Sequence, residues 1–328
     1  MSTPTTDAPT ARPRSDSSQP PPPVVPATTS AERVAVAKQY GLRSLNVRPP
    51  LSEYIRDLVR RWPFISVMAS STAYARNQNN YLGQLWSVLT PILNAAVYVL
   101  IFGVLLGISR HVDNSIAFIV IGVFMFRFIE ASVTGGAKSI SGKTQLLRSL
   151  HFPRAVLPIS TVLSQLATLV PALAVMCAIT LLSGFIGDYE MVRITWWWLL
   201  LPCAVALLWI FNTGVAFIVA RIVATTPDLD NIISFFMRVL MYGSGVIFPL
   251  GTYIEQMKLS PVAHTIVSGA LEYQPVAVYL YLTRSSLLQD ELFPPSGMMW
   301  TLGAVWAVVF FVIGFVFFWS GEEKYGRD

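Results

Sequence analysis

The chain alternates between long apolar blocks and short polar segments. Each apolar block is close to the about 20 residues that an α-helix needs to cross a membrane. Six such blocks are predicted as spans, at residues 86–107, 115–136, 157–185, 196–223, 232–251 and 299–319. Backbone amides find no water partner in lipid, so uninterrupted apolar segments of this length are satisfied only as helices. The sequence therefore predicts an all-α transmembrane protein, with six spans within residues 85–321.

An amphipathic segment precedes the first block. Its apolar residues recur at helical spacing and are Ile55, Leu58, Val59 and Trp62, with charged residues between them. This pattern is typical of a helix that lies on a membrane surface. Pro63 is tolerated in the first turn of a helix but not in its interior, so a second helix should begin there. We expect amphipathic interface helices over residues 51–84.

Residues 1–50 and 322–328 are predicted to be cytoplasmic tails. The first of them is rich in Pro, Ser and Thr and has too few bulky apolar residues to form a core, which predicts disorder. Orientation follows from the basic residues near the spans, which concentrate on the cytoplasmic side of a membrane. On the side of the termini they are Arg56, Arg60, Arg61, Arg76, Lys138, Lys143, Arg148, Arg154, Arg221, Lys324 and Arg327. On the opposite side they are Arg110, Arg193, Lys258 and Arg284.

The segment between the fifth and sixth predicted spans, residues 252–298, is too long for a turn and too apolar for a solvated loop. Pro261 and Pro275 divide it into two parts. We expect two short helices that dip into the outer face of the membrane.

Composition agrees with a membrane protein. Hydrophobic residues make up 54% of the chain and charged residues 12%, whereas soluble domains carry about 25% charged residues. The net charge of +5 is spread between the apolar blocks and indicates membrane orientation rather than nucleic-acid binding. Cys177 and Cys203 lie within apolar blocks without a nearby histidine, so we interpret them as buried apolar residues, with a disulfide as the alternative.

Residues 136–144 look like a phosphate-binding loop, but the pattern is broken. The first glycine that the spacing requires is replaced by Ala137, and the segment follows a predicted membrane helix instead of a strand. The three histidines lie in separate loops, and no pair of carboxylates shares a helix face. We therefore expect no catalytic residues, no metal and no cofactor in this chain, and no ATP hydrolysis by it.

Three ionisable residues lie inside predicted spans: Arg127 and Glu130 in the second and Arg238 in the fifth. Charges within a membrane are costly and usually face a partner or a wet cavity. Arg127 and Glu130 are three residues apart and share one helix face. They either form a structural ion pair or, with Arg238, line a path for the substrate, and the sequence leaves both alternatives open.

The loop after the second span carries a specific motif, Leu147-Arg148-Ser149-Leu150-His151-Phe152-Pro153-Arg154-Ala155-Val156-Leu157-Pro158. It is similar to the Leu-Lys-Lys-x-x-Phe-Pro-Arg-x-x-Leu-Pro of ABC-2 type permeases that export O-antigen, teichoic acid and galactan. Further matches follow the order of that family. They are Arg76, Gly83 and Trp86 in the interface segment, Ser244 to Pro249 at the end of the fifth span, and Pro275 and Arg284 in the outer segment. Trp62 is a further candidate residue of the interface helix, from its apolar spacing.

The resemblance covers the chain from residue 52 onward, with departures such as Gly245 and Phe248, which replace Pro and Tyr of the family pattern. It implies a six-helix ABC-2 exporter domain that works as a homodimer with two copies of a separate ATPase, which would bind ATP and Mg²⁺. The residues that would couple to the ATPase are Leu147, Arg148, His151, Phe152, Pro153 and Arg154. The residues of the outer gate would be Ser244, Pro249, Pro275 and Arg284.

The implied substrate is a polysaccharide linked to a polyprenyl-diphosphate lipid, exported across the inner membrane. Which polymer is carried stays open among galactan, O-antigen and teichoic acid. One rival is an ABC-2 permease for a small drug, which would have the same fold. Another is a membrane-embedded polyprenyl-phosphate glycosyltransferase, whose candidate acidic residues are Asp228 and Asp230, more simply interpreted as helix caps.

Overall fold

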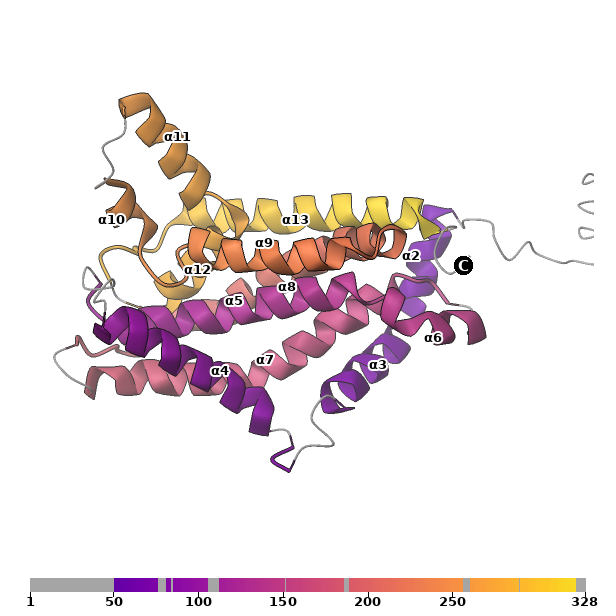
Figure 1. Ribbon diagram of the computed structural model, residues 1–328, viewed down its shortest axis with the longest axis horizontal. Helices are drawn as coiled ribbons and strands as arrows, with labels where there is room; N and C mark the ends of the chain where they lie inside the picture. The colour runs from indigo at the N-terminus through magenta and orange to yellow at the C-terminus, as the bar shows by residue number, and fades with distance from the viewer. Residues whose placement is uncertain are drawn as a thin grey trace, which may run out of the picture. The chain divides into compact units, whose positions relative to one another are not determined.

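The computed structural model describes residues 50–75, 81–83, 85–105, 112–150, 152–185, 189–255, 260–288 and 290–322. The chain divides into two units, residues 1–47 and 48–328, and every described residue belongs to the second. The predicted disordered tail, apart from Pro50, therefore lies outside the described residues. Within the described ranges every regular element is a helix (Figure 1).

Four helical segments of the described chain are long and apolar enough to cross a membrane, namely Ser115–Ala137, Val156–Phe185, Trp196–Thr225 and Gly297–Ser320. They contain α5 (Ser115–Ala137), α7 (Val156–Leu182) with η3 (Ser183–Phe185), η4 (Trp196–Leu200) with α8 (Leu201–Thr225), and α13 (Gly297–Ser320). These four segments match four of the six predicted spans to within a few residues, because uninterrupted apolar runs define them.

The other two predicted spans are shorter helices. α4 (Leu85–Tyr98) continues into the π-helix η1 (Val99–Leu105), and its apolar part is confined to Val88–Gly103. α9 (Leu229–Gly243) has 15 residues, which corresponds to about 22 Å.

The prediction of one continuous helix over residues 232–251 is wrong at its C-terminal end. α9 ends at Gly243, and a turn follows in which Gly245 has a φ of 72°, a left-handed conformation that favours glycine. Pro249 then precedes a new helix, α10 (Leu250–Glu255). Val246 and Ile247 inside this turn are buried, so the hydrophobic run continues across the break in the helix.

The bundle is built around α5, whose side chains are buried along most of its length against α7 and α8. α8 and α13 pack closely where Gly214 meets Gly314, because a Cβ atom on Gly314 would lie 2.2 Å from the Gly214 carbonyl oxygen. Gly136 of α5 approaches α8 in the same way, at Ala216. Small residues at such crossings let membrane helices come into backbone contact.

One end of the bundle carries α2 (Leu51–Arg60), α3 (Trp62–Ala75), η2 (Ser141–Lys143) and α6 (Thr144–Ser149) (Figure 1). The two helices predicted on either side of Pro63 are thus present. A second apolar cluster joins Tyr54 and Ile65 of these helices to α7, α8 and α13. Ile55 and Val59 of α2 and the neighbouring Trp62 of α3 are exposed, so α2 has an apolar face that the described part of the chain does not cover.

The opposite end carries α10, α11 (Pro261–Glu272) and α12 (Pro275–Leu287) (Figure 1). α11 and α12 are the two short helices predicted in the outer segment. They differ in environment, since α12 is buried along nearly its whole length and α11 has no buried residue.

Candidate functional site

The three ionisable residues predicted within spans share one cavity. A volume of about 450 Å³ lies between α4, α5 and α9. Its polar lining residues are Asn94, Tyr98, Arg127, Glu130, Thr134, Ser234, Arg238 and Tyr242. Two guanidinium groups and one carboxylate give this lining a net positive charge, and hydroxyl groups surround them. The cavity therefore offers hydrogen-bond partners beside α5, one of the long apolar helices.

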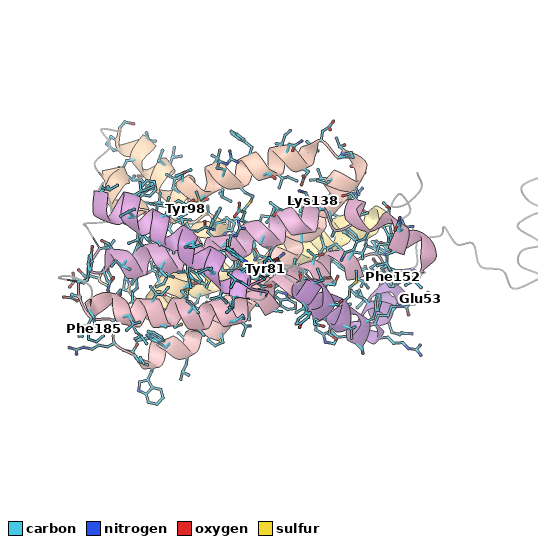
Figure 2. The ribbon with its side chains drawn as sticks, turned by 60° about the horizontal axis from the view of Figure 1, so that its bottom comes forward. Glu53, Tyr81, Tyr98, Lys138, Phe152 and Phe185 are labelled. Carbon is cyan, nitrogen blue, oxygen red and sulfur yellow. The ribbon has the colours of Figure 1, made fainter. Side chains whose placement is uncertain are left out.

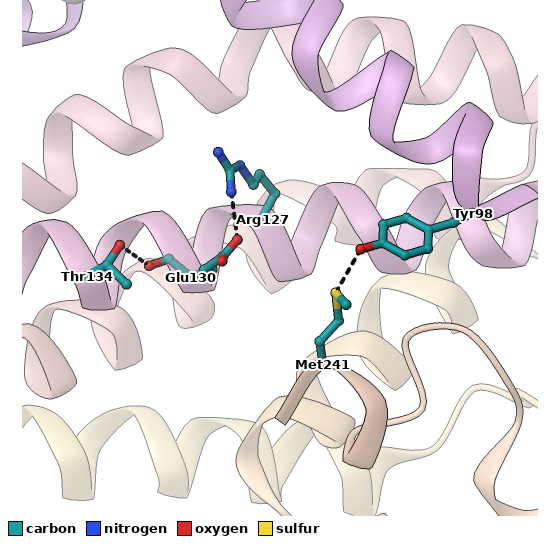
Figure 3. A network of polar contacts seen from close by, with 5 residues as sticks. All are labelled: Tyr98, Arg127, Glu130, Thr134 and Met241. Carbon is teal, nitrogen blue, oxygen red and sulfur yellow. Dashed lines mark hydrogen bonds and ion pairs between the residues drawn. The ribbon is translucent and has the colours of Figure 1, made fainter. Parts of the chain in front are cut away.

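Arg127 and Glu130 form an ion pair at the wall of this cavity (Figure 3). The Arg127 Nη1 and Glu130 Oε2 atoms are 2.7 Å apart, and the two side chains are 48% and 35% exposed. Both partners belong to α5, so their bond does not join two helices. Their exposure leaves the remaining guanidinium donors and carboxylate acceptors accessible from the cavity.

A contact between α4 and α9 closes part of the same cavity. The Tyr98 hydroxyl donates to the Met241 sulfur at 3.4 Å, and the Thr134 hydroxyl donates to the Glu130 carbonyl at 2.7 Å (Figure 3). The thioether sulfur of methionine is a weak hydrogen-bond acceptor, so this link between α4 and α9 is weak. Arg238 lies on an exposed face of α9.

Arg127 also borders a second, smaller cavity, of about 150 Å³, between α4, α5 and α7. Trp86, Gln165 and Thr168 line it as well. The family resemblance assigns Trp86 to the interface segment. In the structure Trp86 lies at the start of α4 and lines this cavity. The two cavities thus share the Arg127 side chain.

The predicted coupling loop lies at the end of the bundle that carries α2, opposite Phe185 (Figure 2). Phe152 is half-buried and its ring meets Phe64 of α3 edge-on, with centroids 5.6 Å apart. Leu147 and Pro153 are also half-buried. The Phe152 ring is therefore partly covered by α3 of this chain.

Arg154 binds the C-terminal end of α13. Its backbone N–H donates to Glu322 Oε1 at 2.9 Å, and its guanidinium donates to the Glu322 carbonyl oxygen. The Tyr54 hydroxyl donates to Glu322 Oε2 at 2.9 Å and accepts from the Ala155 N–H at 3.0 Å. Burial raises the pKa of the Glu322 carboxyl, against the lowering effect of these hydrogen bonds.

Some predicted coupling and interface residues are only partly accounted for. His151 and Arg76 lie outside the described residues, and Arg148 is described only by its backbone in α6. Gly83 has a φ of 50° in the turn before α4. Tyr54, Phe64 and Glu322 were missed, because each meets the loop only through folding and no local motif marks it.

The predicted gate residues gather at the opposite end, around Arg284. This side chain is 3% exposed, and its guanidinium donates to the Gly245 carbonyl at 2.7 Å and to the Val246 carbonyl at 2.8 Å. It also lies over the Phe118 ring of α5, 3.5 Å from the centroid. Gly122 allows this approach, because a Cβ atom there would be 2.6 Å from Arg284 Nη2.

Ser244, Pro249 and Arg284 line a cavity of about 200 Å³ at this end. The Ser244 hydroxyl donates to the Gln274 side-chain oxygen at 3.4 Å, immediately before Pro275 begins α12. The structure thus brings together gate residues that the sequence places on separate elements.

The two acidic residues that the glycosyltransferase hypothesis would require, Asp228 and Asp230, lie at the start of α9. Asp230 Oδ2 is 3.1 Å from Lys138 Nζ, a bond that joins the end of α5 to the start of α9. Asp228 occupies the cap position of α9, but its side chain makes no capping hydrogen bond. The stretch 136–144 begins in the last turn of α5, not after a strand, and runs through a turn and η2 to the start of α6.

Comparison with known proteins places this arrangement among transporters. The family described as "ABC-2 type transporter" matches residues 64–269. The "O-antigen export system permease protein RfbA" of Myxococcus xanthus is 27% identical over 269 residues, which cover 82% of this chain and 96% of that protein. A protein of the same name from Klebsiella pneumoniae is 25% identical over 229 residues, with 66% of this chain and 85% of that protein covered.

Proposed function

Because the chain belongs to the ABC-2 type transporter family, we propose that it is the permease subunit of an ABC exporter for a polysaccharide. The observation that carries this proposal is the cavity shared by Arg127, Glu130 and Arg238. A hydroxyl-rich polymer that crosses a membrane needs hydrogen-bond partners along its path, and this cavity offers them. The names of the curated relatives support a surface polysaccharide as the substrate class.

We propose six spans, the four long apolar segments together with α4–η1, whose apolar part is confined to Val88–Gly103, and the 15-residue α9. Both of these shorter helices border the polar cavity. α9 also carries exposed apolar residues, namely Ile232, Phe235, Phe236 and Val239. Such a surface beside a polar cavity suits contact with a second copy of the chain, so a homodimer would complete the wall of the path.

The energy would come from a separate ATPase, present in two copies with ATP and Mg²⁺. The broken phosphate-loop pattern at Ala137 and the helix before it support this assignment. The loop 147–154 would receive the ATPase, and Leu150, which is 49% exposed, supplies an apolar contact there. This end of the bundle would face the cytoplasm, with both termini on that side of the inner membrane.

The polymer would travel attached to a polyprenyl-diphosphate lipid that stays in the membrane. The exposed apolar face of α2 supports a position of α2 and α3 at the membrane surface, where such a lipid would arrive. The gate residues around Arg284 would then lie at the outer end of the path.

Purification of the tagged chain from its native membranes tests the proposal. We expect a stable complex with an ATPase subunit, in equal numbers of the two chains, and MgATP hydrolysis by the complex. The purified permease should show no hydrolysis when it is separated from that subunit. Hydrolysis at a catalytic rate by the permease, or a complex without any ATPase, would contradict the assignment.

A further inference from the structure

Three segments that are far apart in the sequence meet at one carboxylate. Tyr54 of α2, Arg154 of the loop before α7 and Glu322 after α13 are joined by hydrogen bonds. Tyr54 and Glu322 are separated by 268 positions. The contact therefore fixes the position of elements that the chain itself does not hold together.

The surroundings of this set are apolar. Tyr54 is 1% exposed, and Ala155 and Phe318 are fully buried beside it in the second apolar cluster. A carboxylate in such surroundings costs free energy unless its oxygens accept hydrogen bonds. Glu322 has a donor for each oxygen, the Tyr54 hydroxyl for one and the Arg154 amide for the other.

Two further hydrogen bonds in this set involve backbone groups. The Arg154 guanidinium donates to the Glu322 carbonyl, just beyond the end of α13, where helix carbonyls lack partners and a cation is favourable. The Tyr54 hydroxyl is used both as donor and as acceptor, since it also receives the Ala155 amide. Displacing any one of α2, the loop or α13 would break bonds to the other two.

We infer that Glu322 is a positioning residue of the transport cycle, which ties the end of α13 to α2 and to the loop that receives the ATPase, so that the three move as one unit. This inference rests on the proposed function. Apolar contacts alone tolerate sliding, whereas directed hydrogen bonds specify one arrangement. A displacement of the loop by the ATPase would then also displace α13, which packs along α8 through the crossing at Gly214 and Gly314.

The test uses the complex of the full chain with its ATPase, reconstituted in lipid vesicles. Glu322→Gln keeps the volume and one acceptor oxygen, and Glu322→Ala removes both. Asp57→Asn is the matched control, because Asp57 is an exposed carboxylate on α2. The measurements are the amount of ATPase bound, the kcat and KM for MgATP, and polysaccharide export per folded transporter in cells.

We expect both Glu322 variants to bind the ATPase within about twofold of wild type. Export per folded transporter should fall at least about fivefold, and the kcat of the complex should change without a change in KM. Asp57→Asn should match wild type in every measurement. A merely structural role would lower the amount of folded protein and leave export per folded transporter unchanged.

Several outcomes would overturn the inference. Normal export per folded transporter in Glu322→Ala would do so, and so would failure of both Glu322 variants to fold, since the residue would then serve folding only. If the wild-type chain bound no ATPase and exported no polymer, the proposed function itself would fail, before any variant is compared.

Discussion

Replacement of Arg284 by Met should destabilise the outer end of the bundle by about 2–4 kcal/mol. The change removes the donors to the Gly245 and Val246 carbonyls, both of which are buried in the turn after α9. Each buried carbonyl left without a donor costs about 1–3 kcal/mol, or about 2–6 kcal/mol for the two. Removing a buried charge recovers part of this, because the guanidinium itself is desolvated in the folded protein.

Thermal unfolding in lipid nanodiscs, followed by tryptophan fluorescence, measures the effect. At about 2–4 °C per kcal/mol, Arg284→Met should lower the unfolding temperature by about 4–16 °C. Arg284→Lys should fall between Met and wild type, because an ammonium keeps the charge but cannot bond two carbonyls in the fork geometry of a guanidinium. Arg238→Met is the matched control, since Arg238 is exposed, and should change stability by less than about 0.5 kcal/mol.

An Arg284→Met protein that unfolds at the wild-type temperature would contradict this role of Arg284. It would mean that the turn after α9 does not depend on the guanidinium, and that the carbonyls find other donors. An equal loss in the Arg238→Met control would also refute it, because the effect would then follow from the loss of any arginine.

Three further predictions concern packing, pH and orientation. Gly314→Ala places a Cβ 2.2 Å from a backbone oxygen of α8 and should cost about 1–3 kcal/mol in unfolding measurements, whereas Gly297→Ala, with no atom within 4 Å of its Cβ, should not. Burial raises the pKa of Glu322 in the folded protein above its ordinary value of about 4.3. The stability that Glu322 contributes is therefore fully present below a pH of about 4.3 and is lost as the pH rises through the folded pKa. Glu322→Gln should flatten this part of the plot of unfolding temperature against pH. With both native cysteines replaced by alanine, a cysteine at Arg193 should react with an impermeant maleimide in intact cells and one at Gly142 should not, and the reverse pattern would invert the topology.

The long spans could be predicted from the sequence because apolar content alone defines them. α5, α7, α8 and α13 each coincide with an uninterrupted apolar run. The break after α9 could not be placed in this way, since the turn that contains Gly245 is itself buried and apolar. Hydrophobicity reports burial, and a buried turn has the same composition as a buried helix.

The candidate site was predictable only in part. The spacing of Arg127 and Glu130 places them on one face of a helix, and the ion pair follows from that spacing. That Arg238 of another helix borders the same cavity depends on how α5 and α9 pack, which no local pattern encodes. The bond between Tyr54 and Glu322 is an extreme case, because a single tyrosine and a single glutamate carry no signal of their pairing.

Deletion of the gene that encodes this chain, in its source organism, tests the proposed export of a polysaccharide. Surface polysaccharide and polymer retained inside the cell are measured in the same cells. We expect the surface polymer to disappear while lipid-linked polymer accumulates inside, and wild-type chain supplied in trans to reverse both changes. Complementation by a chain with Arg127→Gln and Arg238→Gln should restore less surface polymer at equal protein level. Unchanged surface polysaccharide in the deletion strain, without polymer retained inside, would contradict the account.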